Sequence, residues 1–286
     1  MEASKEDVLA TKPDCLAGAA TLAKAEGIGV TKASMNVGRM FALAIMAGIQ
    51  IGMGALFMTY VKADSSLGFA AASVLGGLCF SLGLICVIVA GSELFTGNAL
   101  MIIAKASGKI GWGGMLKNWV VVWVGNFVGS LVLVGIIVGC GVMGIKGYAD
   151  GSTVNTIGDQ MVKVASGKIN LTASQIFFRG IVCNLLVCLA VWMGFCGRTV
   201  IDKIFTSIFP VMAFVALGAE HCVANMFFLP MGVIANGMGY GGDIVLTWGG
   251  ALYNIGLATL GNIVGGAVFV GLIYWVAYHK KADAKA

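Results

Sequence analysis

Charged residues are scarce in this chain. They make up 11% of the 286 residues, whereas a soluble domain carries about 25%. Apolar residues account for 59%, so there is too little polar surface to cover a water-facing globule. The chain also has only three prolines and no long polar tract, which argues against disorder. The composition therefore indicates a protein that lies within a membrane.

Further absences narrow the chemistry. None of the eight cysteines forms a CxxC pair, and those within apolar runs are expected to be small buried side chains rather than disulfides. The motifs HExxH, GxSxG and GxxxxGK[ST] are missing, which disfavours metalloprotease, hydrolase and nucleotide-binding functions. Glu220, His221 and Cys222 are consecutive and cannot all face one ion. We therefore expect no metal, no cofactor and no enzymatic activity.

Six apolar segments are long enough to cross about 30 Å of hydrocarbon. The second and fifth are too long for one straight helix, and each carries polar residues near its middle. We predict an all-α integral membrane protein with six transmembrane helices, two of them broken. The predicted spans are residues 37–61, 69–104, 115–143, 172–196, 204–236 and 247–278.

The flanks of these spans predict the orientation of the chain. If both termini lie in the cytoplasm, thirteen of the eighteen Lys and Arg residues lie on the cytoplasmic side, as the positive-inside rule requires. The net charge of +5 then belongs to the inner membrane face, and no nucleic-acid partner is needed. Residues 1–36 lack the apolar core of a signal peptide and predict a cytoplasmic segment with a helix on the membrane surface. Residues 37–278 form the transmembrane domain, and residues 279–286 a cytoplasmic tail.

An internal repeat is the most informative feature. Residues 91–98 read GSELFTGN and residues 218–225 read GAEHCVAN, so that both follow G-x-E-x-x-x-small-N at an offset of 127 residues. A second pair of similar segments begins with Gly-Asn at residues 125 and 261. The chain thus divides into halves of three spans, 37–143 and 172–278. Because three is odd, the second half enters the membrane from the opposite side, and such inverted repeats point to a transport site near the midplane.

Glu93 and Glu220 are the only acidic residues within the predicted spans. A charge at the bilayer centre costs at least ~2.5–3.5 kcal/mol. Glycine at the start of each octet lets the main chain leave helical geometry, and the freed amides and carbonyls need partners. We interpret each glutamate as a structural cap of a broken helix; the alternative is that it binds transported protons or cations. The residues assigned this structural role are Gly91, Glu93, Asn98, Gly218, Glu220 and Asn225.

His221 lies inside the second octet, and the other histidine is in the tail. A single histidine in a span is often a satisfied core residue. A broken segment that faces a pore favours a functional role instead, because imidazole can donate a hydrogen bond to a passing anion.

At these residues the chain resembles the formate/nitrite transporter family of pentameric anion channels. The resemblance covers nearly the whole chain. It is carried by CFSLGL (79–84), LFT (94–96), AKASG (104–108), KNW (117–119), NLLVCLAVWM (184–193), EH with ANM (220–226) and GN (261–262).

The resemblance implies a homopentamer of aquaporin-like protomers, each with its own pore. It implies that Thr96 and His221 form the central anion site, with Asn262 nearby, and that Lys168 is a vestibule lysine. Apart from the resemblance, Lys168 could equally be an interfacial anchor and the phenylalanines ordinary core. The residues implied as apolar constrictions are Phe80, Leu84, Leu94 and Phe214.

These expectations imply a mechanism. Moving a bare anion into a medium of ε ≈ 4 costs tens of kcal/mol, so an apolar constriction stops the anion but not its neutral conjugate acid. Lys168 would draw the anion into the vestibule, where desolvation raises the proton affinity of the anion. A proton supplied through His221 or water would then let the neutral acid cross. We predict proton-coupled transport of small monovalent anions of weak acids across the cell membrane.

The sequence ranks the substrates only by resemblance. Formate comes first because residues 104–108 and 117–119 look most like formate members. Nitrite is second because residues 91–97 and 125–130 look like nitrite members, and hydrosulfide is third. Two other functions stay open: a membrane-embedded enzyme that uses Glu220, His221 and Cys222, and a water channel, which the lack of an Asn-Pro-Ala pair disfavours.

Overall fold

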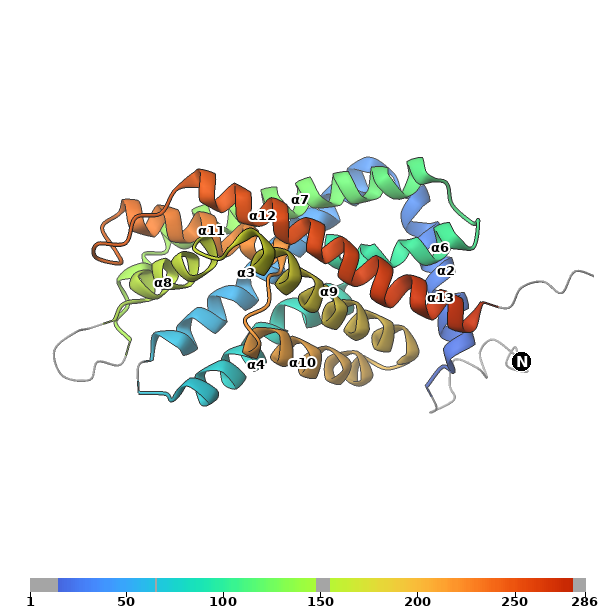
Figure 1. Ribbon diagram of the computed structural model, residues 1–286, viewed down its shortest axis with the longest axis horizontal. Coiled ribbons are helices and arrows are strands. Elements are labelled where there is room, and N and C mark those ends of the chain that lie inside the picture. Colours follow the sequence, from blue (N-terminus) through green and yellow to red (C-terminus); the bar gives the residue numbers. More distant parts are fainter. Residues whose placement is uncertain (1–14, 65, 148–154, 280–286) are drawn as a thin grey trace, which may run out of the picture.

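The computed structural model describes residues 15–64, 66–147 and 155–279. This part of the chain is a bundle of helices without named strands; its one β-bridge joins Lys146 to Thr156. Figure 1 shows an elongated molecule, with α2 and α13 at one end and α8 at the other.

The first half begins with α2, a helix of 17 residues that precedes the long apolar helices. The long helices α3 and α7 are uninterrupted, whereas the segment between them is divided into α4 and three short helices. The elements are α2 (Gly18–Ser34), α3 (Val37–Ala63), α4 (Phe69–Ala90), α5 (Phe95–Asn98), η1 (Ala99–Met101), α6 (Ile102–Ala106) and α7 (Trp112–Gly139).

The second half follows the same order, after a short η2 (Val142–Gly144). Its first helix, α8, begins at a capping box formed by Thr156 and Asp159. Its last helix changes from α to π geometry and back. The elements are α8 (Ile157–Ile169), α9 (Ala173–Cys196), α10 (Val200–Ala216), α11 (Cys222–Gly237), α12 (Trp248–Ile263), the π-helix η3 (Val264–Leu272) and α13 (Ile273–Tyr278).

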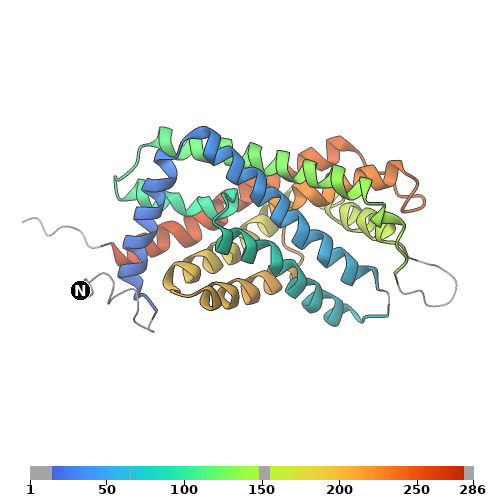
Figure 2. The ribbon, with the colours of Figure 1, turned by 180° about the vertical axis from the view of Figure 1, so that it is seen from behind.

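Five helices of the described residues are long and apolar enough to cross a membrane: 37–63, 69–90, 112–139, 173–196 and 248–278. A non-helical break interrupts each of the predicted spans 69–104 and 204–236, and Figure 2 shows the first break on the chain beyond α4. The breaks at 91–94 and 217–221 lie at the predicted octets. The all-helical membrane fold and the two interruptions are therefore confirmed.

Glycines end the helix before each break. Gly91 follows α4 with φ +78°, and Gly218 follows α10 with φ +64°. A residue with a Cβ is disfavoured in this left-handed region, whereas glycine enters it at no steric cost. The two glycines thus turn the chain out of the helix at matching places.

The two halves also pack alike. Helix α3 contacts α4 and α7, α9 contacts α10 and α12, and α4 packs on α10 across the halves. At the α3–α7 crossing a Cβ on Gly129 would collide with the carbonyl of Ile45, and where α9 crosses η3 a Cβ on Gly265 would collide with that of Ile181. Small residues at these crossings let the main chains touch, as in other membrane helices.

Helix α2 lies across one end of the bundle (Figure 2). Its Glu26 accepts hydrogen bonds from Ser107 Oγ at 2.5 Å and from Lys109 Nζ at 2.6 Å, between α6 and α7. Burial alone would raise the pKa of Glu26, but these hydrogen bonds and the positive charge of Lys109 prevail and lower it. The ion pair thus ties α2 to the loop between α6 and α7.

Candidate functional site

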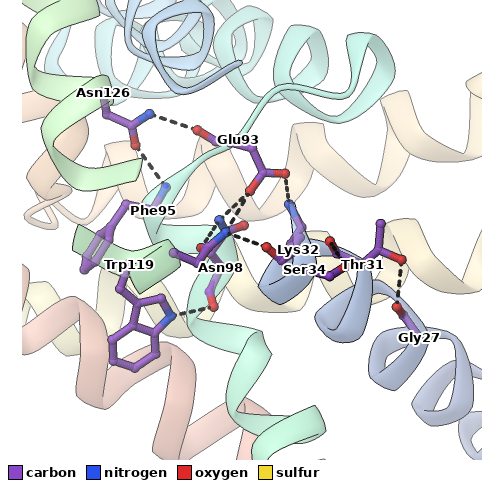
Figure 3. Close-up of polar contacts among 10 residues, drawn as sticks. Gly27, Thr31, Lys32, Ser34, Glu93, Phe95, Asn98, Trp119 and Asn126 are labelled. Atoms are coloured by element: carbon purple, nitrogen blue, oxygen red, sulfur yellow. Dashed lines mark hydrogen bonds and ion pairs between the residues drawn. The ribbon is translucent and has the colours of Figure 1, made fainter. Parts of the chain in front are cut away.

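The first break is held by a buried carboxylate. Glu93 accepts hydrogen bonds from Lys32 Nζ of α2 at 2.5 Å and from Asn98 Nδ2 at 2.7 Å. Asn98 Nδ2 also donates to Asn118 Oδ1 of α7 at 2.8 Å. Figure 3 shows these side chains converging on Glu93. The glutamate joins α2, the break and α7.

A second asparagine of α7 holds the main chain of the break. Asn126 Nδ2 donates to the carbonyls of Glu93 at 2.9 Å and Ala44 at 2.8 Å. Its Oδ1 accepts the N–H of Phe95 at 2.9 Å. One buried amide side chain thus satisfies two main-chain groups of the break, and its second hydrogen joins the break to the carbonyl of Ala44 in α3.

The second break repeats the carboxylate network. Glu220 accepts from Lys168 Nζ of α8 at 2.9 Å and from Asn225 Nδ2 at 2.6 Å. Asn225 Nδ2 also donates to Asn254 Oδ1 of α12 at 2.7 Å, and Asn254 Nδ2 donates to Glu220 at 3.1 Å. Both oxygens of the carboxylate therefore have donors.

Asn262 holds the second break as Asn126 holds the first. Its Nδ2 donates to the carbonyls of Glu220 at 2.9 Å and Gly180 at 2.8 Å, and its Oδ1 accepts the N–H of Cys222 at 2.9 Å. Both hydrogens of its amide are in use, so neither is directed at a ligand. The structure thus places Asn262 behind the break.

The two breaks meet at Thr96 and His221, whose Oγ1 and Nε2 lie 3.1 Å apart. His221 is the N-cap of α11, and its Nδ1 accepts the N–H of Ala224 at 3.0 Å. Because Nδ1 is an acceptor, the proton of the neutral ring is assigned to Nε2. The ring therefore presents an N–H, and Thr96 a hydroxyl, at the same point.

Two side chains of α9 hold the main chain of Thr96. Asn184 Nδ2 donates to the Thr96 carbonyl at 3.1 Å and to the Asn262 carbonyl at 2.6 Å, and Cys188 Sγ lies 3.3 Å from the Thr96 carbonyl. A Cβ on Gly266 of η3 would collide with both side chains. The π-helical segment thus makes room for the two groups that position Thr96.

A cavity of about 260 Å³ opens on the α8 side of this pair, and we call it the α8 vestibule. His221 lies at its inner end, beside the ring of Phe214 at a centroid distance of 5.9 Å. Phe80 packs against Phe214 at 5.4 Å and against Phe228 at 6.3 Å. Three phenylalanines and the imidazole thus form an aromatic wall around the inner end of this vestibule.

A second cavity of about 160 Å³ opens toward α2, and we call it the α2 vestibule. Its lining includes Leu84, Leu94 and Lys32. Leu94 is 3% exposed and is the N-cap residue of α5, as His221 is of α11. The predicted constriction residues therefore divide into a phenylalanine pair in the α8 vestibule and a leucine pair in the α2 vestibule.

Several residues of the site were not predicted from the sequence. Lys32 is the counterpart of Lys168, and their spacing of 136 residues equals that of the Gly-Asn pairs, so extending the repeat toward the N-terminus would have revealed it. Asn184, Cys188 and Phe228 carry no such signal. They have no matching residue type in the other half, and their roles depend on contacts between distant helices.

Comparisons with known proteins agree with this geometry. The family model for formate/nitrite transporters matches residues 19–276. The formate channel FocA of Escherichia coli K12 is 39% identical over 289 residues, which cover 94% of this chain and 97% of FocA. A probable formate transporter of Methanothermobacter thermautotrophicus is 36% identical over 266 residues, covering 89% of this chain and 94% of the relative.

Solved structures show the same similarity. A pentameric formate channel with formate bound is 41% identical, with a TM-score of 0.73 over 85% of this chain and 98% of that one. An ion channel of the same family is 29% identical, with a TM-score of 0.78 over 90% of this chain and 98% of that one. A family match over most of the chain, close relatives and a shared fold together show that this multi-pass membrane protein belongs to the formate/nitrite transporter family.

Proposed function

We propose that the chain forms a homopentameric channel for small monovalent anions of weak acids, with formate as the first substrate and a pore through each protomer. One observation carries the proposal. Thr96 Oγ1 and His221 Nε2, which lie 3.1 Å apart and bond to each other, meet between two vestibules, where an anion that enters between them could accept a hydrogen bond from each. The relatives named formate channels or transporters support formate, and the similar pentameric structure supports the assembly.

The proposed topology has six crossings in two inverted halves, with both termini and the α2 vestibule on the cytoplasmic side. Matching contacts at a constant offset support the repeat. Trp123 and Thr259 occupy equivalent positions in α7 and α12 and bond to each other, Nε1 to Oγ1, at 3.1 Å. A contact between equivalent positions is expected where a pseudo-two-fold axis passes between the halves.

The proposed mechanism combines the apolar walls with protonation. A bare anion would have to lose its water against Phe80 and Phe214 on one side and Leu84 and Leu94 on the other. Because desolvation raises the proton affinity of a carboxylate, the anion takes up a proton in the vestibule and crosses the wall as the neutral acid. Thr96 and His221 then bind it between the walls by hydrogen bonds.

We assign the proton to vestibule water rather than to His221. A relay through the ring would require a proton on Nδ1, and that nitrogen already accepts the N–H of Ala224. Donation of the only proton on Nε2 would leave an imidazolate anion, which is too strong a base to form near neutral pH. His221 therefore serves as a fixed hydrogen-bond donor, and flux depends on pH through the substrate.

The test is uptake of formate, nitrite and hydrosulfide into proteoliposomes from pH 5 to 8, for the wild type and His221→Asn. Asparagine keeps a donor but does not titrate in this range. We expect the variant to transport more slowly while its rate falls with rising pH as in the wild type. Loss of the pH dependence in His221→Asn would instead show that His221 relays the proton. A wild-type protein that takes up none of the three anions would refute the proposed function, and a rate order with nitrite or hydrosulfide first would replace formate.

A further inference from the structure

The two vestibules differ in charge. The α8 vestibule is lined by four basic side chains, and Glu220 is the only acidic one among its described residues. The α2 vestibule is lined by one basic side chain, Lys32, which is paired with Glu93. The four basic residues of the α8 vestibule are Lys62, Lys163, Lys168 and Arg179.

Most of the positive groups in the α8 vestibule already have partners. Lys168 pairs with Glu220 at 2.9 Å, so these two charges largely cancel. Lys163 is exposed and donates to Asn155 Oδ1 at 3.0 Å. Arg179, also exposed, donates from Nη1 to the Gly218 carbonyl at 3.2 Å.

Lys62 stands apart from these three. It lies in the last turn of α3 and is half-buried, with its stem along α4, where a Cβ added to Gly76 would lie 3.6 Å from the Lys62 Cε. No described residue accepts a hydrogen bond from its Nζ or pairs with its charge. An ammonium group carries three donors, and partial removal from water is costly unless an acceptor replaces the water.

We propose that Lys62 Nζ is an anion-binding subsite in the α8 vestibule, at which a small carboxylate or a weak-acid anion of similar size is held before it reaches Thr96 and His221. The subsite rests on the proposed function in that it takes the same substrate. It gives the anion an ammonium whose donors have no acceptor in the described part of the chain, in a vestibule where Lys168 is neutralised by Glu220 and where Lys163 and Arg179 already donate to neutral acceptors. The α2 vestibule has no counterpart, since its lysine is paired.

The consequence is a difference between the two entrances. An uncompensated charge raises the local concentration of anions and the rate of their entry, and salt screens this effect over about 10 Å at 0.1 M. Entry from the α8 side therefore falls as ionic strength rises, whereas entry from the α2 side changes little.

The experiment measures binding and transport separately. Binding of ¹³C-formate to the purified channel is titrated by NMR for Lys62→Gln, Lys62→Arg and Lys146→Gln. The last is a matched control, because Lys146 is exposed and outside the cavity lining. The titrations are repeated in a Thr96→Val background, which removes a donor of the central pair. Formate uptake into proteoliposomes is measured for the same variants at low and high ionic strength.

We expect Lys62→Gln to weaken the residual formate binding in the Thr96→Val background about threefold or more, the size expected for a partly exposed ion pair. It should also raise the half-saturating formate concentration at low ionic strength and leave the maximal rate unchanged. Lys62→Arg should preserve both values, and Lys146→Gln should change neither. Residual binding and salt dependence that are unaffected by Lys62→Gln would overturn the subsite. Uptake that Thr96→Val leaves at the wild-type rate would instead contradict the proposed central site.

Discussion

The breaks at 91–98 and 218–225 share one scaffold and differ at the pore. In each, a lysine from a preceding helix and an asparagine of the octet bind the buried glutamate, while an asparagine of the last long helix holds the main chain. The hydrogen bonds of Asn126 and Asn262 agree in length to within 0.1 Å. The scaffold has been kept in both halves.

The differences lie where the two breaks meet. Leu94 occupies the position of His221, and Thr96 that of Val223. Each half thus has one polar and one apolar residue at these two equivalent positions. The residues that the two halves share hold the breaks in place, whereas the residues that differ supply the hydroxyl and the imidazole where the breaks meet.

A second asymmetry lies behind the pore. In α3, Gly48 approaches the main chain of α7, where a Cβ would collide with the Asn126 carbonyl. In α9 the equivalent residue is Asn184, and it binds the Asn262 carbonyl with its side chain. The Asn184 amide thus takes the place of the close main-chain contact that Gly48 makes in the first half. The same amide also donates to the Thr96 carbonyl. The polar support of the Thr96 main chain therefore comes from the second half only.

The largest loss of stability is expected at the scaffold that the two breaks share. Asn126→Ala and Asn262→Ala each leave two main-chain groups of a break without their partner, at about 1–3 kcal/mol for each buried group. We expect both variants to lose several kcal/mol, with similar large falls in thermal midpoint and in the yield of assembled protein on size exclusion. Asn170→Ala, at an exposed position, should behave as the wild type. A mild effect in only one of the two halves would contradict the equivalence.

The lysine–glutamate pairs come next. Lys32→Gln and Lys168→Gln each leave a buried carboxylate without its counter-charge, and breaking a buried pair costs about 3–5 kcal/mol. Because the lysine side chains are 20% and 15% exposed, the loss should be at the lower end. Thermal unfolding in detergent should show comparable destabilisation. Restoration of neutrality in Lys32→Gln/Glu93→Gln and Lys168→Gln/Glu220→Gln should recover part of the stability, and a double variant less stable than its lysine single variant would contradict this.

The asymmetric pair is expected to affect transport more than stability. Thr96→Val removes a hydroxyl while keeping the shape, and a hydrogen bond between neutral partners contributes about 0.5–1.5 kcal/mol. We expect formate uptake to fall about three- to tenfold, with an unchanged thermal midpoint. The reciprocal change Val223→Thr should leave uptake within a factor of about two. Equal effects of the two changes would mean that both halves bind the anion.

The smallest expected effect is at the glycines that end α4 and α10. Gly91→Ala and Gly218→Ala force a Cβ into the left-handed region, which costs about 1–2 kcal/mol for each residue. No atom within 4 Å obstructs a Cβ at Gly91, and at Gly218 only Arg179 Nη1 lies within that distance, at 3.5 Å. Both should lower the thermal midpoint slightly and equally. A large loss of uptake in one of them would show that the break also moves.

The sequence predicts the helical membrane fold and both breaks because a glutamate and a glycine are each unfavourable within an apolar helix. They can therefore be recognised in an apolar run of the sequence. It suggests a functional role for His221 from the place of this residue in the second octet, and for Thr96 only through the family resemblance. It did not reveal Asn184 or Cys188, because their partner is a main-chain carbonyl about 90 residues away in the chain. It placed Asn262 near the anion, whereas only coordinates show that both amide hydrogens are engaged elsewhere.

Thr96 lies in the first turn of α5, and His221 caps α11, so two short helical segments begin at the same point of the passage. The start of a helix carries a partial positive charge. Under the proposed function, the two helix starts therefore favour an anion, or the electron-rich oxygens of its neutral acid, over a cation, without a charged side chain between them. We expect substitution of single side chains there to change the rate of anion transport without converting this protein into a cation channel.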